Sequence, residues 1–235
     1  MDTGHSTTNL NSMELVRRAL GRPIGTGDLG VMLARAGVGK TACLTHIALE
    51  ELLRGFPVLH VCLNEVPDKI KVWYTEFLKN IVASNPGIDL NQLQHRIEPL
   101  RFILAYLHQT FTPEKLQHSL QNLKEQAKFN PSLVVLDGID FDQATRTTVE
   151  ELRSFAQRNE MSIWMSARTH RHITTVNERG IPYPCNAMDD LFEAIILLEP
   201  VTDAIRLKVL KHVRDFQPEY PALFLNPQTY MLQSG

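Results

Sequence analysis

Hydrophobic and polar residues follow two different periods along the chain, and the changes of period predict a succession of strands and helices. Short apolar runs rich in β-branched residues predict strands that are covered on both faces. The predicted strands span residues 29–33, 58–63, 101–105, 133–136, 162–166, 191–198, 204–213 and 222–225. Apolar residues spaced three and four apart predict helices over residues 12–20, 42–54, 67–84, 113–128 and 147–158.

The remaining segments have weaker patterns. Residues 1–11 are polar and are expected to be loose, and residues 88–99 are weakly helical. Residues 168–190 are polar and rich in turn-forming residues, which predicts a long surface loop. The helix over residues 12–20 has an apolar stripe and is expected to pack on its own domain, with docking on a neighbouring subunit as the alternative.

Strands alternate with helices first and then follow one another directly, and this order predicts an α/β fold. We expect a mainly parallel central sheet flanked by helices, with antiparallel strands at its C-terminal edge. Residues 1–24 are interpreted as an N-terminal tail and short helix, and residues 25–235 as one domain.

Composition narrows the choice of function without selecting one. The formal net charge of the 235-residue chain is only −2, so no overall basic field indicates nucleic acid. Neither a membrane-spanning apolar run nor a signal-peptide pattern is present, which predicts a cytoplasmic protein without a membrane partner. Cys43, Cys62 and Cys185 include no close pair and are expected to be buried thiols.

The strongest candidate for chemistry is the glycine-rich loop Ala34-Arg-Ala-Gly-Val-Gly-Lys-Thr41, which lies between a predicted strand and a predicted helix. It matches the pattern Ala/Gly-x-x-x-x-Gly-Lys-Ser/Thr of phosphate-binding loops. Its glycines allow the amide groups to turn inward at a helix N-terminus, where partial positive charge attracts anions. The predicted phosphate-binding residues are Ala36, Gly37, Val38, Gly39, Lys40, Thr41 and Ala42.

A second candidate is Asp137, the last residue of an apolar run that begins at Ser132. A carboxylate at the C-terminal end of such a strand points into the crevice where open α/β sheets bind ligands. Together with the hydroxyl of Thr41, Asp137 is predicted to hold Mg²⁺, directly or through water. The cofactors expected from these residues are ATP and Mg²⁺.

The neighbours of these residues separate the classes of nucleotide-binding protein. Gly138 follows Asp137, so the Asp-Glu pair typical of AAA+ and ABC-type ATPases is missing. The chain has no Asn-Lys-x-Asp stretch for reading guanine, and Ala34 stands where ParA-type ATPases carry an extra lysine. A carboxylate that activates water must then come from elsewhere, and the end of the second strand offers Glu65 after Asn64. If the strand order is the common one, we expect this strand to lie next to the strand of the glycine-rich loop.

The order of these features resembles that of the RecA-like ATPases, in particular the KaiC-like and DnaB-like branch. The resemblance extends over residues 25–227 and is carried by residues 34–41, 60–67, 133–137, 163–166 and the late strand pair. It implies that Lys40 and Glu65 are catalytic, with Glu65 polarising the attacking water. Where KaiC-like sequences have two adjacent acids, this chain has Asn64 and Glu65.

The resemblance also implies roles for residues later in the chain. Ser166, Arg168 and His170 are candidates for sensing the γ-phosphate, although Arg168 could equally form a surface salt bridge. His170 and His172 resemble half of a metal site, but a polar loop explains them better. Relatives insert a Lys-x-Arg pair into the neighbouring subunit's ATP site. Here Lys211 and Arg214 would face opposite ways on a regular strand, whereas His212 and Arg214 would share a face. Arg214 is therefore the candidate, and a bulge could restore the pair.

Three hypotheses about function follow. The first is a Mg²⁺-dependent ATPase that forms a homo-oligomeric ring or filament. The second is a nucleotide-gated interaction switch with little hydrolysis, favoured by Asn64 and the irregular Lys211 and Arg214 spacing. A small-molecule kinase fits less well, because no acceptor pocket or arginine-rich lid is evident. DNA binding through Arg168, Arg171, His172 and Arg179 is less favoured than an ordinary solvated loop.

Overall fold

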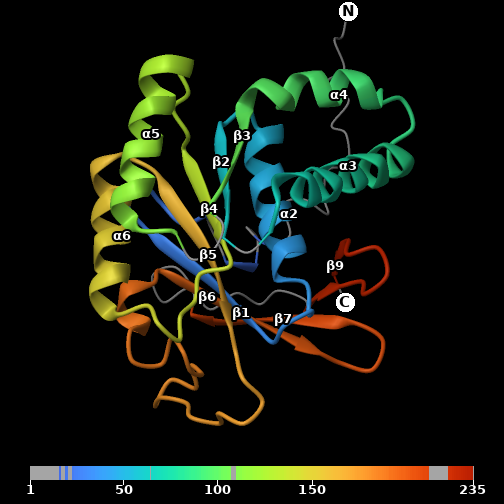
Figure 1. The fold of residues 1–235 in the computed structure, drawn as a ribbon. Coiled ribbons are helices and arrows are strands. Elements are labelled where there is room, and N and C mark those ends of the chain that lie inside the picture. Colours follow the sequence, from blue (N-terminus) through green and yellow to red (C-terminus); the bar gives the residue numbers. More distant parts are fainter. Residues whose placement is uncertain are drawn as a thin grey trace, which may run out of the picture.

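In the described part of the chain, the strands form a nine-stranded sheet with the order β3-β2-β4-β5-β1-β6-β7-β8-β9 (Figure 1). The computed structural model describes residues 16, 19, 20, 23–63, 65–106, 110–211 and 222–234. The strands are β1 (Leu29–Ala34), β2 (Val58–Cys62), β3 (Arg101–Ala105), β4 (Leu133–Asp137), β5 (Ser162–Arg168), β6 (Ala194–Pro200), β7 (Ile205–Lys211), β8 (Leu223–Leu225) and β9 (Leu232–Ser234). The helices are α2 (Lys40–Leu53), α3 (Pro67–Ser84), α4 (Leu90–Ile97), α5 (Pro113–Ala127) and α6 (Arg146–Arg158), with short 3₁₀ turns η1 (Glu98–Leu100) and η2 (Asp189–Leu191).

The sheet is parallel from β3 through β6 and antiparallel from β6 to β9, as the sequence predicts. Because the parallel strands share one direction, their C-terminal ends meet at one edge of the sheet. The predicted position of the second strand is wrong, however. β2 lies between β3 and β4, and both β4 and β5 separate it from β1.

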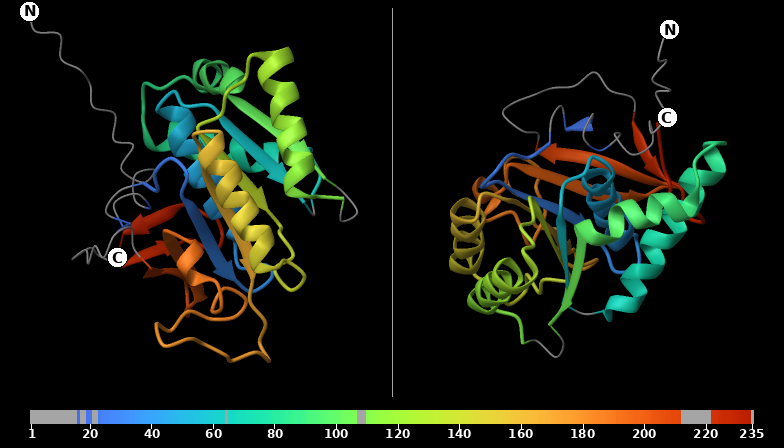
Figure 2. Two further views of the ribbon diagram at one scale, coloured as in Figure 1. Left: turned by 90° about the vertical axis from the view of Figure 1, so that its left-hand side faces the viewer. Right: turned by 90° about the horizontal axis from the view of Figure 1, so that it is seen from above.

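Helices cover both faces of the parallel part of the sheet (Figure 2). Residues of α2, α3 and α4 form one apolar core with one face, and residues of α5 and α6 form another with the opposite face. The central strands β1, β2 and β4 are therefore buried along their whole length, which explains their continuous apolar runs.

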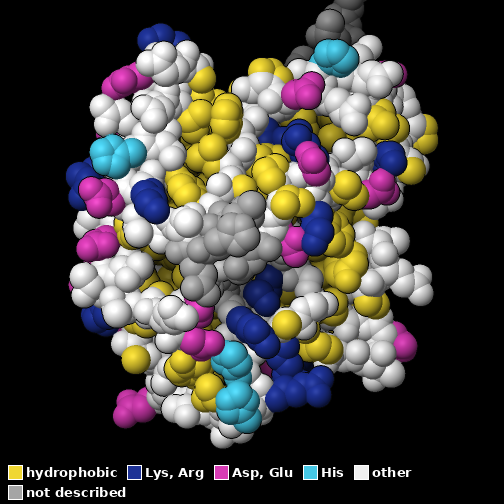
Figure 3. All heavy atoms as spheres, in the orientation of Figure 1, with side chains coloured by type: hydrophobic (Ala, Val, Ile, Leu, Met, Phe, Trp, Pro, Cys, Tyr) yellow, Lys and Arg dark blue, Asp and Glu magenta, His cyan; other side chains and the backbone are white. Residues whose placement is uncertain are grey.

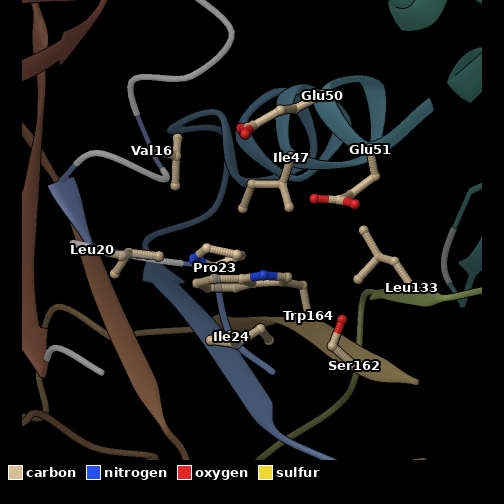
Figure 4. A pocket seen from close by; sticks show the side chains of 10 residues that line it. All are labelled: Val16, Leu20, Pro23, Ile24, Ile47, Glu50, Glu51, Leu133, Ser162 and Trp164. Atoms are coloured by element: carbon tan, nitrogen blue, oxygen red, sulfur yellow. The ribbon is translucent and has the colours of Figure 1, made fainter. Parts of the chain in front are cut away.

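The described residues of the N-terminal segment pack on this same domain, which confirms the expectation for them. Val16, Ala19 and Leu20 are buried in the core beside α2, and the rest of the predicted helix lies outside the described residues. Figure 4 shows Pro23 lying against the ring of Trp164, with Ile47 of α2 above it. Only a small cavity of about 40 Å³ remains between them.

The segment between β5 and η2 forms no helix and no strand beyond an isolated bridge between Val176 and Pro182. It is more than a surface loop, because Ile181 and Cys185 are completely buried in the core beneath α6. All three cysteines are buried free thiols, as predicted. No described helix has the length and apolar character needed to cross a membrane.

Candidate functional site

The glycine-rich loop connects the buried strand β1 to α2 at the C-terminal edge of the sheet. Gly37 and Gly39 have φ angles of 77° and 106°, in the left-handed region that favours glycine. At Gly39 a side chain would also meet protein, since a Cβ would lie 3.0 Å from Leu225 and 3.2 Å from Tyr230. Both backbone conformation and space therefore require glycine at position 39.

The N-terminus of α2 differs from those of the helices that have a capping side chain. Asp89, Thr112 and Thr145 accept a hydrogen bond from the first turns of α4, α5 and α6, respectively. Gly39 precedes α2 and provides no such group, and the first turn of α2 contains no acidic residue. The amides of this turn, with their partial positive charge, are left to interact with an external anion.

Lys40, the first residue of α2, lies folded back over the loop. Its Nζ donates hydrogen bonds to the carbonyl oxygens of Ala34 and Arg35, each 3.1 Å away. Burial lowers the pKa of Lys40, Asp137 acts in the opposite direction, and the positive charge of Arg168 lowers it further. The ammonium group is thus held at the loop by main-chain oxygens that a stronger anionic partner could replace.

Asp137 is the centre of the polar network in the site. Thr41 Oγ1 donates to Asp137 Oδ2 over 2.6 Å, and Ser166 Oγ donates to Asp137 Oδ1 over 2.7 Å. The Gly138 amide donates to Ser166 Oγ over 2.7 Å. Asp137 is only 8% exposed, and two hydroxyls compensate its burial. The structure brings the two predicted metal ligands, Thr41 and Asp137, into direct contact.

A cleft of about 460 Å³ opens beside this network. Its charged lining consists of two cations, Lys40 and Arg168, and of four carboxylates, Glu65, Asp137, Asp140, Asp142. Sequence reasoning missed Asp140 and Asp142, although the alternating acids in the loop that follows β4 were an available signal. The carboxylates outnumber the cations, so a bound cation would offset their repulsion of an anionic ligand.

Glu65 lies at the cleft even though β2 is not adjacent to β1. Its carboxylate forms an ion pair with Lys69 one helical turn later, at 2.6 Å. Asn64 lies outside the described residues. The carboxylate predicted to activate water therefore lies at the cleft, where it is paired with Lys69.

The three sensor candidates have different surroundings. Ser166 is bound to Asp137, whereas Arg168 lines the cleft and forms no ion pair with any described residue. His170 Nε2 lies 2.7 Å from Asp142 Oδ2, and the Tyr183 hydroxyl donates to Asp142 Oδ1 over 2.9 Å. Burial is the largest single influence on the pKa of Asp142 and raises it, but the hydrogen bonds from Tyr183 and His170 and the charges of His170 and Arg168 together outweigh it, so the pKa is lowered.

Among the described residues, His170 and His172 do not form a metal site with other side chains. Their rings are 5.6 Å apart, and His170 is engaged by Asp142. Within the described ranges no group of three or more His, Cys, Asp or Glu side chains could hold a metal ion. Mg²⁺ does not need such a group, because it usually keeps several waters and binds through one or two carboxylates together with phosphates. Thr41 and Asp137 fit this mode of binding.

Lys211, at the end of β7, is engaged within its own chain. Its Nζ donates to the carbonyl oxygens of Asp189 and Phe192, at 2.9 and 2.6 Å. The pairing of β6 with β7 shifts register just before Lys211, so this irregularity precedes the predicted Lys211 and Arg214 pair. His212 and Arg214 lie outside the described residues.

The four residues considered for DNA binding have different surroundings. Arg168 lines the cleft, and Arg179 forms an ion pair with Asp189 at 3.0 Å. Arg171 and His172 are also exposed, and within the described residues neither lines the cleft nor forms an ion pair.

Comparison with known proteins found no protein-family model and no curated protein that matches the chain.

Proposed function

We propose that the protein is a Mg²⁺-dependent, RecA-like P-loop ATPase, similar to the KaiC-like and DnaB-like branch. It binds ATP in the cleft and hydrolyses it to ADP and phosphate to drive assembly or a conformational change. The proposal rests chiefly on the 2.6 Å contact between Thr41 and Asp137, which are 96 residues apart in sequence and meet beside Lys40. Such a contact is expected where a phosphate-binding loop and a metal-binding carboxylate serve one nucleotide.

In this proposal, different groups of the chain bind the phosphates, hold the metal and orient the attacking water. The uncapped amides of α2 and the Lys40 ammonium hold the phosphates, and Lys40 exchanges its two carbonyl partners for phosphate oxygens. Thr41 and Asp137 would hold Mg²⁺, which supplies charge neutralisation on the phosphates. Glu65 would orient the attacking water, and Arg168 would stabilise charge on the terminal phosphate.

Replacing Lys40 with Ala tests the proposal directly. We expect ATP affinity to fall at least tenfold and turnover to be lost, because the main ammonium in the cleft is removed. The matched control is Lys79→Ala, which removes an exposed lysine of α3 that pairs with Glu76 away from the cleft. Chelation of Mg²⁺ should also abolish ATP binding by the unaltered protein. Calorimetric titration measures both effects, and undiminished ATP binding by Lys40→Ala would refute the proposal.

A specific observation favours the second candidate, a nucleotide-gated switch with little hydrolysis. The ion pair between Glu65 and Lys69 holds the carboxylate that should activate water. Steady-state phosphate release separates the two functions. An ATPase loses this release on Glu65→Gln substitution, whereas a switch binds ATP tightly and shows negligible release before and after the substitution.

A further inference from the structure

A second cavity of about 490 Å³ lies next to the cleft but shares no lining residue with it. Arg35 contributes to its wall, while the following residue, Ala36, lines the cleft. In the same way Arg168 lines the cleft and the next residue, Thr169, lines the second cavity. The two cavities thus meet at the ends of β1 and β5, where the Thr169 amide donates to the Ala34 carbonyl over 3.0 Å.

The charges of this second cavity are unbalanced. Arg206 is neutralised by Glu199, which is the acidic residue of the lining. Arg35 and Arg171 are exposed, and neither guanidinium forms an ion pair or a side-chain hydrogen bond within the part of the chain that the structure describes. Figure 3 shows Lys and Arg side chains gathered beside histidines around the ends of β1 and β5. The cavity therefore has two unpaired positive charges.

The rest of the lining combines hydroxyls with an apolar floor. Thr169 and Thr174 contribute to the lining and carry hydroxyl groups, and apolar residues supply much of the remaining wall. The apolar members are Ile173, Pro182, Leu197, Leu198, Pro200 and Val201. The volume lies within the range of small-molecule sites, which typically combine apolar walls with a few polar groups that fix orientation.

From these features we propose that this cavity is a binding site for a small organic phosphate monoester, separate from the nucleotide cleft. Two guanidinium groups match the two negative charges and several acceptor oxygens of a phosphate monoester, and the threonine hydroxyls can donate to further oxygens. The apolar floor holds the organic part of the ligand. A carboxylate has only one negative charge and would leave some of these donors without a partner.

Arg35 contacts both the second cavity and a residue of the cleft. Its side chain lines the second cavity, and its carbonyl oxygen accepts the 3.1 Å hydrogen bond from Lys40 Nζ. His170 provides another connection, because it lines the second cavity and binds Asp142 of the cleft. A ligand that fixes the Arg35 segment therefore acts on the carbonyl that holds Lys40 in place.

Phenyl phosphate is a suitable probe, since it combines a dianionic phosphate with an apolar ring. In calorimetric titrations we expect it to bind the unaltered protein more tightly than inorganic phosphate, benzoate or phenol does. Arg35→Ala and Arg171→Ala should each weaken binding at least tenfold. Arg158→Ala, which removes an exposed arginine at the end of α6, is the matched control and should have no effect.

The nucleotide cleft is distinguished by the Lys40→Ala variant. Lys40 does not line the second cavity, so this variant should keep phenyl phosphate binding even where ATP binding is lost. Equal binding of phenyl phosphate by the Arg35→Ala, Arg171→Ala and unaltered proteins would overturn the proposal. So would loss of phenyl phosphate binding in Lys40→Ala, since the ligand would then occupy the cleft. Equal affinity for benzoate would show that phosphate is not recognised.

Discussion

At the scale of single residues, Asp137 shows how hydrogen bonds within the chain order the wall of the cleft. Its oxygens accept hydrogen bonds from hydroxyls that come from two different elements, α2 and β5. A buried carboxylate with fixed partners keeps one orientation and does not have to be reordered when a ligand binds. Ser166 also accepts the Gly138 amide and so fixes the chain that leaves β4.

Replacing Ser166 with Ala should raise the Mg²⁺ concentration that the proposed nucleotide binding requires. Asp137 Oδ1 loses its donor, and the Gly138 amide loses this acceptor. We expect the Mg²⁺ concentration for half-maximal ATP binding to rise about tenfold, as is usual when a group that orients a metal ligand is removed. Ser162→Ala, at the opposite end of β5, is the matched control. An unchanged Mg²⁺ dependence would show that Ser166 does not position Asp137.

At the scale of elements, the C-terminal hairpin β8–β9 supports the start of α2. Leu225 and Tyr230 approach the position of Gly39, and the Tyr230 carbonyl lies 2.7 Å from His46 Nε2. The Tyr230 ring also packs edge-on against Trp73 of α3 at 4.9 Å. An element far away in sequence thus fixes the backbone of the glycine-rich loop.

The contribution of this hairpin can be tested with two substitutions at Tyr230. Tyr230→Ala removes the ring that packs on Trp73 and beside Gly39, so we expect weaker ATP binding and a change in tryptophan fluorescence. Tyr230→Phe keeps the ring and should behave like the unaltered protein. Titration of ATP and the emission spectrum measure the two effects. If Tyr230→Ala binds ATP as tightly as Tyr230→Phe does, the hairpin does not support the loop.

Most elements were predictable because their patterns are local. The bounds of α3 and β3 agree with the prediction, and β6 begins three residues later than expected. The strand β9 was missed, because three residues give no recognisable period. Within the site, Thr41 and Asp137 follow from motif and strand end. The Glu65 pair with Lys69 depends on side-chain geometry that spacing alone does not determine.

At the scale of the whole molecule, strand order decides how the site is assembled, and the sequence alone did not determine it. β5 lies between β1 and β4, so Ser166 and Arg168 are placed between the glycine-rich loop and Asp137. Strand order depends on long-range pairing, which hydrophobic periodicity does not encode. ATP-dependent assembly into a ring or filament remains a prediction.

The layer between the sheet and α2 and α3 should also make the stability of the molecule depend on pH. His46 stacks on Phe77, and His60 Nδ1 lies 3.0 Å from the Tyr74 hydroxyl. Burial lowers the pKa of His46 from 6.5 to about 4, against the opposing effect of its hydrogen bond with the Tyr230 carbonyl. Burial also lowers the pKa of His60 to about 4, with Asp137 opposing and Arg101 assisting.

Because the unfolded chain binds protons at these histidines below pH 6.5 and the folded chain does not until about pH 4, acid favours unfolding. Between pH 7.5 and 5, each histidine should reduce the free energy of unfolding by about 2 kcal/mol. Urea denaturation across this range measures the loss. His46→Gln and His60→Gln should each remove part of the pH dependence, whereas substitution of the exposed His95 by Gln should leave it unchanged. A free energy of unfolding that stays constant from pH 7.5 to 5 would mean that these histidines are not held neutral in the folded layer.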